Sequence, residues 1–393
     1  MRKVLFVVKN SALNRGMSTG IENLAWKIAG QGVDVEVLSG GNEPEVPKLD
    51  APSAVRYHFS GGDGKPNDLL RAYVRLSRGS SFSFVIGWIK NIAPIAHWCR
   101  QRDGSRPLFI ANQGITDKPQ YDAGVLRFPS RLRKILKIFY SVSAGFPSLF
   151  RYAVYPEKLH RNVDLVVANS GAVRRNAETV YGIPSERCRV IHRSIDTNMY
   201  RAAASGKSSV SAPMYLLHSG IVDDRKGVHD VVGALCQLEI PVKYVLCGPA
   251  KPAYLERMRK QLASSGRPHE IIFEGVVNPS DLVNRYRGAD VFCLCSYTEG
   301  FSKSLLEAMA SGLPVIVSDI DPFKEIVVDG INGLMVKLGC SASIADAIRR
   351  FSYDNALRMS CASAARATVE ERFDAAVEVR AWMKVFDEYT PSV

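Results

Sequence analysis

The sequence lacks a long apolar run and has no signal-peptide core. The longest apolar segment, residues 138–150, is interrupted by serines, Gly145 and Pro147, so it falls short of the roughly 18 apolar residues that a membrane-spanning helix requires. The run from Val4 to Val8 is too short for the core of a signal peptide, and Lys9 ends it. We therefore expect a cytoplasmic protein, soluble or peripheral to a membrane.

The sequence also lacks recognisable cysteine and histidine motifs. Its eight cysteines show neither the C-x-x-C pairs of a zinc site nor the density of a secreted disulfide framework. Its seven histidines form no H-x-x-x-H cluster. Reduced thiols are the simplest expectation, and Cys293 and Cys295, which fall in an apolar strand, are expected to pack in a core.

What the sequence does have is length, apolar content and positive charge. Its 393 residues predict two or three domains, and 46% hydrophobic against 23% charged residues exclude a disordered chain. The formal net charge of +12 indicates an anionic partner. On this ground alone the partner is a nucleic acid, lipid headgroups or a phosphorylated metabolite.

Short apolar runs alternate with segments of helical period, which predicts parallel sheets covered by helices on both faces. The expected strands cover residues 3–8, 33–38, 84–86, 108–111 and 165–168, then 214–218, 243–246, 271–273, 291–294 and 314–317. We expect an α/β protein with Rossmann-like domains at 1–205 and 206–370 and a ligand in the cleft between them. Residues 201–212 predict a linker, and residues 371–393 a C-terminal helix that fits packing on either domain.

The most informative stretch, residues 290–318, predicts a strand, a turn, a helix and a second strand. Ser302 or Ser304 can cap the helix, and Gly312 with Pro314 ends it. The loop before the helix therefore lies at the carboxyl end of a parallel strand, where α/β sheets bind ligands.

That loop carries groups suited to phosphate and to sugar hydroxyls. Backbone N–H groups of residues 300–302 at the helix start can hold a phosphate, and Glu299 can accept hydrogen bonds from a sugar. Glu307, in the second helical turn, can reach back to grip two ribose hydroxyls, because helical side chains lean toward the N-terminus. A plainer interpretation pairs Glu307 with Lys303 on the helix surface.

In the context E-G-F-x-x-x-x-x-E-A-x-A-x-G-x-P-V-I, which runs from Glu299 through Glu307, this stretch resembles the retaining GT-B glycosyltransferases of family 4. Further similar segments follow in the family's order at residues 19–38, 163–177, 190–201, 218–235, 245–250, 273–277 and 323–336. The resemblance implies the GT-B fold, with two Rossmann-like domains facing a cleft. It also implies glycosyl transfer from a nucleoside-diphosphate sugar to an acceptor hydroxyl with retention of configuration.

The resemblance further implies residue roles. Glu299 would contact the transferred sugar, Glu307 the ribose and Lys226 the diphosphate, whose growing charge a fixed cation stabilises most in the transition state. Without the family match, Arg225 and Lys226 look like an ordinary solvated basic pair. The expected site residues are Glu299, Lys226 and Gln113 for catalysis; Gly20, Arg225, Lys226, Gly248, Val277, Glu299, Gly300, Phe301, Ser302 and Glu307 for the donor; and Arg15, Gly16, Thr19 and Gln113 for the acceptor.

Two positions depart from the family pattern. Ile221 stands where members commonly carry an Arg for the phosphates, and Gln113 where many have a His. Gln113 can hydrogen-bond a sugar but cannot take a proton, which fits a mechanism in which the departing phosphate accepts the acceptor's proton. Asp319 and Asp321 have the D-x-D spacing of metal-dependent glycosyltransferases of another fold; we interpret it as coincidence and expect neither a metal nor a cofactor.

Residues 125–161 carry eight Lys and Arg against one Glu, a net +7, with aromatic residues interleaved. Such a stretch suits an anionic membrane surface, although a solvated helical face with a packed aromatic side explains it equally well. A nucleic-acid partner is disfavoured, because no helix-turn-helix, zinc finger or RNP-type pattern accompanies the charge.

Taken together, these features predict a retaining, metal-independent glycosyltransferase. It would move a hexose-type sugar from a UDP- or GDP-sugar to a glycan or lipid-linked acceptor in bacterial polysaccharide, lipopolysaccharide or glycolipid biosynthesis. The alternative is a GT-B-like protein that binds a nucleotide or scaffolds a complex with little or no catalysis, which Ile221 and Gln113 motivate.

Overall fold

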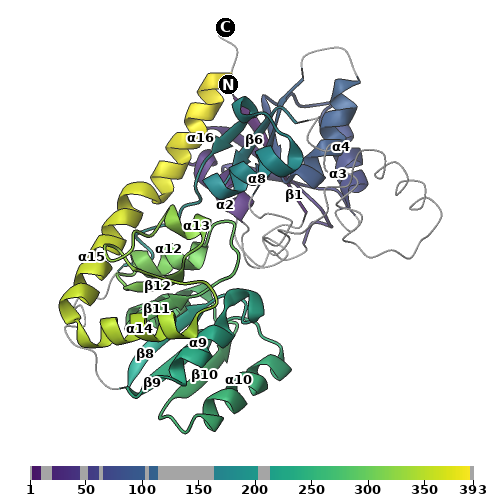
Figure 1. The fold of residues 1–393 in the computed structure, drawn as a ribbon. Coiled ribbons are helices and arrows are strands. Elements are labelled where there is room, and N and C mark those ends of the chain that lie inside the picture. Colours follow the sequence, from purple (N-terminus) through teal and green to yellow (C-terminus); the bar gives the residue numbers. More distant parts are fainter. Residues whose placement is uncertain are drawn as a thin grey trace, which may run out of the picture. The chain divides into compact units, whose positions relative to one another are not determined.

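The structure, a computed structural model, describes residues 2–9, 20–44, 52–61, 65–101, 106–113, 163–201 and 213–389. The chain forms two compact α/β units (Figure 1). Unit 1 consists of residues 1–191 and 379–393, and unit 2 of residues 192–378.

Unit 1 is built on a parallel sheet whose described strands have the order β3-β2-β1-β4-β5-β6-β7. The strands are β1 (Lys3–Val8), β2 (Asp34–Ser39), β3 (Val55–Phe59), β4 (Phe84–Gly87), β5 (Leu108–Gln113), β6 (Leu165–Ala168) and β7 (Cys188–Val190). The chain winds outward from β1 in one direction and then, from β4 on, in the other. This order is that of a doubly wound, Rossmann-like sheet.

Helices cover both faces of the unit 1 sheet. They are α2 (Gly20–Ala29), α3 (Pro66–Leu76), α4 (Ile89–Arg100), α8 (Gly171–Tyr181) and the part of α16 (Ala375–Tyr389) from Val379 on, with a short 3-10 turn, η1 (Ser185–Arg187). Val4 and Phe6 of β1 pack with α2 and with Trp382 of α16. Leu5 and Val7 point to the other face, against α3 and α4, because successive strand residues alternate in direction. Both faces of β1 are therefore buried, as its unbroken apolar run predicts.

Unit 2 repeats this plan. Its parallel sheet has the order β10-β9-β8-β11-β12-β13 in the described residues. The strands are β8 (Met214–Ser219), β9 (Val242–Cys247), β10 (Glu270–Gly275), β11 (Val291–Leu294), β12 (Val315–Ser318) and β13 (Leu334–Val336).

The helices of unit 2 also form two layers (Figure 1). One layer contains α9 (Val228–Leu235), α10 (Pro252–Ser264) and α14 (Ser341–Tyr353); the other contains α11 (Pro279–Gly288), α12 (Lys303–Ala310) and α13 (Asp321–Lys324). The long helix α15 (Asn355–Arg372) contributes Cys361 to the first core and Ala365 and Val369 to the second. In β11, Cys293 belongs to the first core, whereas Phe292 and Leu294 belong to the second. Two sheets of this kind confirm the predicted α/β fold with two Rossmann-like units.

All ten predicted strands are present, with ends that agree within two residues, and the described part of the chain contains three further strands that the apolar pattern does not predict. These strands, β3, β7 and β13, lie at sheet edges. β7 and β13 have only three residues each, and in β3 only Val55 is buried. Edge strands need fewer apolar residues, so they leave a weaker pattern in the sequence.

The unit boundaries differ from the predicted ones at residues 205 and 370. The segment 192–201 belongs to unit 2, because the N–H of Ile195 donates to the carbonyl of Phe373 (3.1 Å) and Thr197 donates to Asp374 (2.7 Å). The predicted linker lies, after Arg201, outside the described residues.

All eight cysteines are described, and all are free thiols. The sulfurs of Cys293 and Cys295 are 3.6 Å apart and both residues are buried, which confirms their predicted place in a core. Within the described part of the chain, no helix is both long and apolar enough to cross a membrane.

Candidate functional site

The candidate site lies at the carboxyl edge of the unit 2 sheet, between β8 and β11. These strands are neighbours, with Leu216 opposite Val291, although 75 positions separate them in the sequence. β9 and β10 extend the sheet on one side of this pair, and β12 and β13 on the other. The loops after β8 and β11 therefore run in opposite directions, and such a switch point is where α/β sheets bind ligands.

Glycine allows the loops at this edge to touch through their backbones. Gly227 ends the loop after β8 with φ +66°, and a Cβ there would lie 2.0 Å from the carbonyl oxygen of Cys295. Gly248, directly after β9, is just as tight, since its Cβ would lie 1.9 Å from the carbonyl oxygen of Gly220. No residue with a side chain fits either position without a backbone shift.

The loop after β8 places Lys226 against the loop after β11. Lys226 ends a 3-10 turn, η2 (Asp224–Lys226), which Asp223 caps by accepting from the N–H of Lys226 (3.1 Å). The carbonyl of Arg225 accepts from the N–H of Tyr297 (2.9 Å), so the two loops are joined by a backbone hydrogen bond. The position of Lys226 is thus set by the fold as well as by its own contacts.

Lys226 and Glu299 form an ion pair in which Nζ donates to Oε1. Their side chains are only 13% and 11% exposed, and Ser296 also donates to Oε1 of Glu299 (3.0 Å). An ammonium group has three donors and a carboxylate has about four acceptor positions. Lys226 can therefore still bind an anion, and Oε2 of Glu299 can still accept from a hydroxyl.

The helix α12 begins beside Glu299. Of the two predicted caps, Ser302 is the N-cap, and its hydroxyl accepts from the N–H of Leu305 (3.4 Å). Phe301 is buried, and its ring stacks on that of His192 with centroids 5.2 Å apart. The N-terminal end of α12, which carries partial positive charge, is therefore held next to the Lys226–Glu299 pair.

Glu307, one turn further along α12, is buried rather than on the surface. Its exposure is 6%, and Tyr200 and Tyr286 donate to Oε1 (3.0 Å) and Oε2 (2.9 Å) respectively. The ion pair with Lys303 is present, with Nζ 3.5 Å from Oε1. The plainer interpretation is thus correct about the pair but wrong about the surroundings of Glu307.

His218, near the end of β8, lies beneath this edge of the sheet and is fully buried. Burial, assisted by the positive charge of Lys226, lowers the pKa of His218 to about 4. The imidazole ring of His218 is therefore uncharged at neutral pH.

Of the other donor residues predicted in unit 2, Arg225 extends along the loop surface, with its guanidinium 3.6 Å from Asp223 and its side chain 44% exposed. Ile221, in the same loop, is 45% exposed. Gly248 stands in the glycine contact described above, and Val277 follows β10, partly buried. Among the donor residues predicted in unit 2, the structure therefore shows direct side-chain contact between Lys226 and Glu299.

The residues predicted in unit 1 are described only in part. Gly20 is the first residue of α2, and Gln113 is the last residue of β5, paired in register with Ala168 of β6. Arg15, Gly16 and Thr19, as well as the basic segment 125–161, lie outside the described residues.

Four site residues have no counterpart in the predicted set: Ser296, Tyr200, Tyr286 and His218. Ser296 precedes Glu299 by only three positions, and the resemblance to E-G-F motifs could have suggested it. Tyr200 and Tyr286 are 107 and 21 positions from Glu307. No local spacing predicts such contacts.

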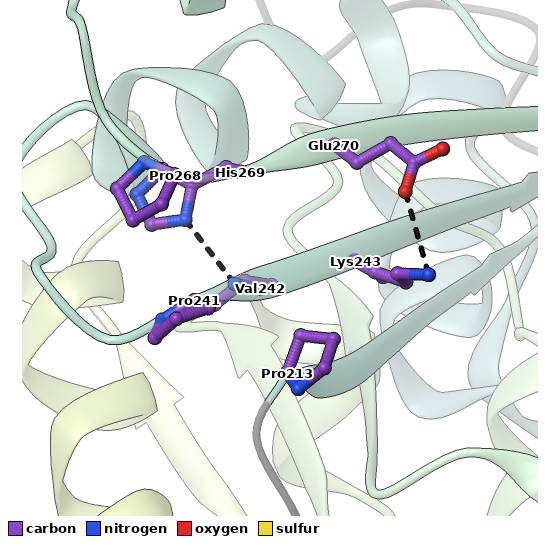
Figure 2. A pocket seen from close by; sticks show the side chains of 7 residues that line it. All are labelled: Pro213, Pro241, Val242, Lys243, Pro268, His269 and Glu270. Atoms are coloured by element: carbon purple, nitrogen blue, oxygen red, sulfur yellow. Dashed lines mark hydrogen bonds and ion pairs between the residues drawn. The ribbon is translucent and has the colours of Figure 1, made fainter.

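Two hollows in unit 2 have linings that include neither Lys226, Glu299 nor Glu307. Figure 2 shows one of about 310 Å³ at the amino ends of β8, β9 and β10, where Nδ1 of His269 accepts from the N–H of Val242 (3.2 Å). It lies at the edge opposite the candidate site. Another, of about 670 Å³, is lined by residues that follow β12 and β13, including Asp319 and Lys337. This second hollow is at the same edge as the site, and Asp319 is paired there with Lys324 (2.7 Å).

Comparison with known families gives the same picture for both units. Residues 14–199 match the family model described as Glycosyltransferase Family 4, and residues 205–368 match that described as Glycosyl transferases group 1. The chain belongs to glycosyltransferase family 4. The matched ranges cover most of the sequence and confirm the family that the E-G-F motif indicates.

Several relatives of this glycosyltransferase are named for their activities. It is 27% identical to D-inositol 3-phosphate glycosyltransferase of Corynebacterium urealyticum over 51% of either chain. It is 28% identical to the lipopolysaccharide core biosynthesis glycosyltransferase LpsE of Rhizobium meliloti, over 58% of this chain and 66% of the relative. The chain thus spans about half to two thirds of the length of these relatives.

Solved structures share the fold over the full length. Sucrose-phosphate synthase from Thermosynechococcus elongatus is similar with a TM-score of 0.76 at 17% identity, covering 98% of this chain and 99% of that one. HepE from Anabaena, in complex with UDP and glucose, has a TM-score of 0.71 at 20% identity, covering 99% and 100%. These similarities confirm the GT-B fold.

Proposed function

We propose that this family member is a retaining glycosyltransferase that moves a hexose-type sugar from a UDP- or GDP-sugar to a glycan or lipid-linked acceptor. The observation that carries the proposal is the contact between Lys226 and Glu299 at the switch point, beside the start of α12. A cation, a carboxylate and a helix N-terminus side by side suit a ligand with both phosphate and sugar hydroxyls. A nucleoside-diphosphate sugar has both.

In the proposed reaction the bond between the anomeric carbon and the diphosphate oxygen breaks, and the bond to the acceptor oxygen forms on the same face. The acceptor's proton passes to the departing phosphate oxygen. Lys226 and the N–H groups at the start of α12 stabilise the charge that grows on the diphosphate, which lowers the barrier because that charge is largest in the transition state. Glu299 orients the sugar by accepting from its hydroxyls, and no metal ion is needed for charge neutralisation.

The relatives support the proposed substrate classes. The HepE structure contains UDP and glucose, and LpsE is named for lipopolysaccharide core biosynthesis. We propose that the protein acts in bacterial polysaccharide, lipopolysaccharide or glycolipid assembly, in the cytoplasm at the inner face of the plasma membrane.

A thermal-shift screen tests the donor. UDP, GDP, ADP and their sugars are each added to the full-length protein, and a cognate donor raises the melting temperature because it binds only the folded state. We expect a shift with a UDP- or a GDP-sugar. Absence of any shift with all of these nucleotides, at millimolar concentrations, would contradict the proposal.

Substitution of Glu299 tests the catalytic assignment. Glu299→Ala should lower the transfer rate by about a hundredfold or more, the effect of removing one transition-state contact, while the protein remains folded. Glu270→Ala, a carboxylate at the opposite edge of the same sheet with a 57% exposed side chain, is the control and should retain full activity. A Glu299→Ala enzyme with normal turnover would refute the role.

A second candidate is binding of a nucleotide without transfer. Ile221 favours it, because this 45% exposed apolar side chain stands in the loop after β8, where a further cation would assist departure of the diphosphate. The two functions differ in one measurement: the second predicts a thermal shift with a nucleotide sugar but neither hydrolysis nor transfer of its sugar.

A further inference from the structure

We propose that Tyr200 and Tyr286 are positioning residues that orient the carboxylate of Glu307 toward the two hydroxyls of a nucleotide ribose, so that the site prefers ribonucleotides to 2′-deoxyribonucleotides. The inference rests on the proposed function, since it assumes that a nucleotide binds at the switch point of unit 2.

The three side chains form a buried hydrogen-bonded group. Tyr200 is 5% exposed, Tyr286 is fully buried and Glu307 is 6% exposed. One tyrosine hydroxyl donates to each carboxylate oxygen, at 3.0 Å to Oε1 and 2.9 Å to Oε2. Because each oxygen has its own fixed donor, the plane of the carboxylate is held in one orientation.

The hydrogen-bond count leaves room for a diol. A carboxylate has about four acceptor positions, two on each oxygen, and the tyrosines occupy one on each. One position on Oε1 and one on Oε2 remain for a ligand. The 2′ and 3′ hydroxyls of a ribose can each take one, whereas a 2′-deoxyribose would leave one oxygen without its donor.

Both tyrosines are themselves held in place. Tyr286 belongs to α11, and its ring meets that of Tyr200 edge-on, with centroids 6.0 Å apart. The guanidinium of Arg366, in α15, donates to the carbonyls of Tyr200 and of Ala310, the last residue of α12. One arginine therefore fixes the backbone of Tyr200 to the helix that carries Glu307.

The tyrosine hydroxyls remain donors over the whole range of useful pH. Burial, and then the charge of Glu307, raise the pKa of both Tyr200 and Tyr286 well above the usual value for tyrosine. Each phenol is therefore protonated at neutral pH. Replacing either by Phe removes the hydrogen bond and keeps the ring that packs in the core.

Lys303 does not block this use of Glu307. Its ammonium lies 3.5 Å from Oε1, longer than a good hydrogen bond, and its side chain is 56% exposed. An exposed ion pair of this kind contributes little to stability. The lysine can turn into solvent when a ligand hydroxyl takes its place.

The experiment compares a nucleotide with its 2′-deoxy form. Dissociation constants of UDP, GDP and the corresponding 2′-deoxynucleotides are measured by calorimetry for the wild type, Tyr200→Phe and Tyr286→Phe. We expect the wild type to prefer the ribonucleotide by about tenfold or more, the value of a hydrogen bond to a charged group. Each variant should weaken ribonucleotide binding by about three- to tenfold, with little effect on the 2′-deoxy form.

Tyr244→Phe is the matched control. Tyr244 is also fully buried in unit 2, but it belongs to the core on the other sheet face, and its hydroxyl has no hydrogen-bond partner among the described residues. This variant should keep the wild-type preference. Wild-type protein that binds neither nucleotide refutes the proposed function. A nucleotide-binding wild type that shows no preference for the ribonucleotide, or variants that keep it unchanged, refute the role of the tyrosines alone.

Discussion

At the residue scale, His218 makes the stability of unit 2 depend on pH. Its pKa is lowered to about 4 by burial and by Lys226, whereas an unfolded histidine titrates near 6.5. Between these values the unfolded chain binds a proton that the folded chain does not, so stability is complete above pH 6.5 and falls as the pH is lowered toward 4. Between pH 7.5 and 4.5 the loss from His218 should be about 2–3 kcal/mol.

The measurement is urea unfolding at these two pH values, with wild type and His218→Leu compared. Carboxylates titrate in both proteins, so the difference between the two losses isolates His218. Far-UV circular dichroism is the probe, because all four tryptophans, Trp26, Trp88, Trp98 and Trp382, lie in unit 1. Equal losses in both proteins would show that His218 is not a neutral buried group.

Single residues also show which part of the site can be predicted from a sequence. Lys226 and Glu299 lie in short segments whose residue order matches a family motif, and they meet because β8 and β11 are adjacent. Tyr200 and Tyr286 carry no such signal. Their contact with Glu307 depends on how α11, α12 and the segment before β8 pack together, and packing of distant elements leaves no spacing in the sequence.

At the scale of elements, Gly227 determines how the loop after β8 meets the loop after β11. Gly227→Ala should destabilise the protein by about 2–4 kcal/mol, because a left-handed alanine costs about 1 kcal/mol and the new Cβ overlaps the carbonyl of Cys295. Thermal or urea unfolding measures this loss. The shift of Lys226 away from Glu299 should also weaken nucleotide binding.

Gly266→Ala is a close control for this prediction. Gly266 has φ +65°, against +66° for Gly227, but nothing lies within 4 Å of its added Cβ. It should therefore cost only the left-handed conformation, about 1 kcal/mol. Equal losses for the two substitutions would mean that the loops separate easily and do not hold the site together.

The elements themselves were predicted where their residues are buried on both faces. β1, β6 and β11 have the predicted ends, since a central parallel strand needs an unbroken apolar run. The edge strand β3 has the sequence VRYHF, and only Val55 in it is buried. Its place is decided by backbone pairing with β2, and side-chain pattern alone does not show that pairing.

At the scale of the whole molecule, positive charge is concentrated in one segment. Residues 125–161 carry +7 of the formal +12 of the chain. A cluster of this density, with aromatic residues between the charges, predicts attraction to anionic lipid, worth about 1 kcal/mol per basic residue near the surface. This attraction would hold the protein at the membrane in which a lipid-linked acceptor lies.

A charge reversal within that segment tests the membrane prediction. Replacing Arg131, Arg133, Lys134 and Lys137 with Glu should release the protein from liposomes that contain phosphatidylglycerol, in a sedimentation assay at low salt. The control reverses four exposed charges outside the segment: Arg259, Lys260, Arg380 and Lys384. It makes the same change in net charge, so it should retain most of the binding if the segment, rather than the total charge, attracts the protein. Equal release of both variants would show that binding depends only on the net charge of the protein. Unchanged binding of the variant reversed within residues 125–161 would exclude this segment as the membrane contact.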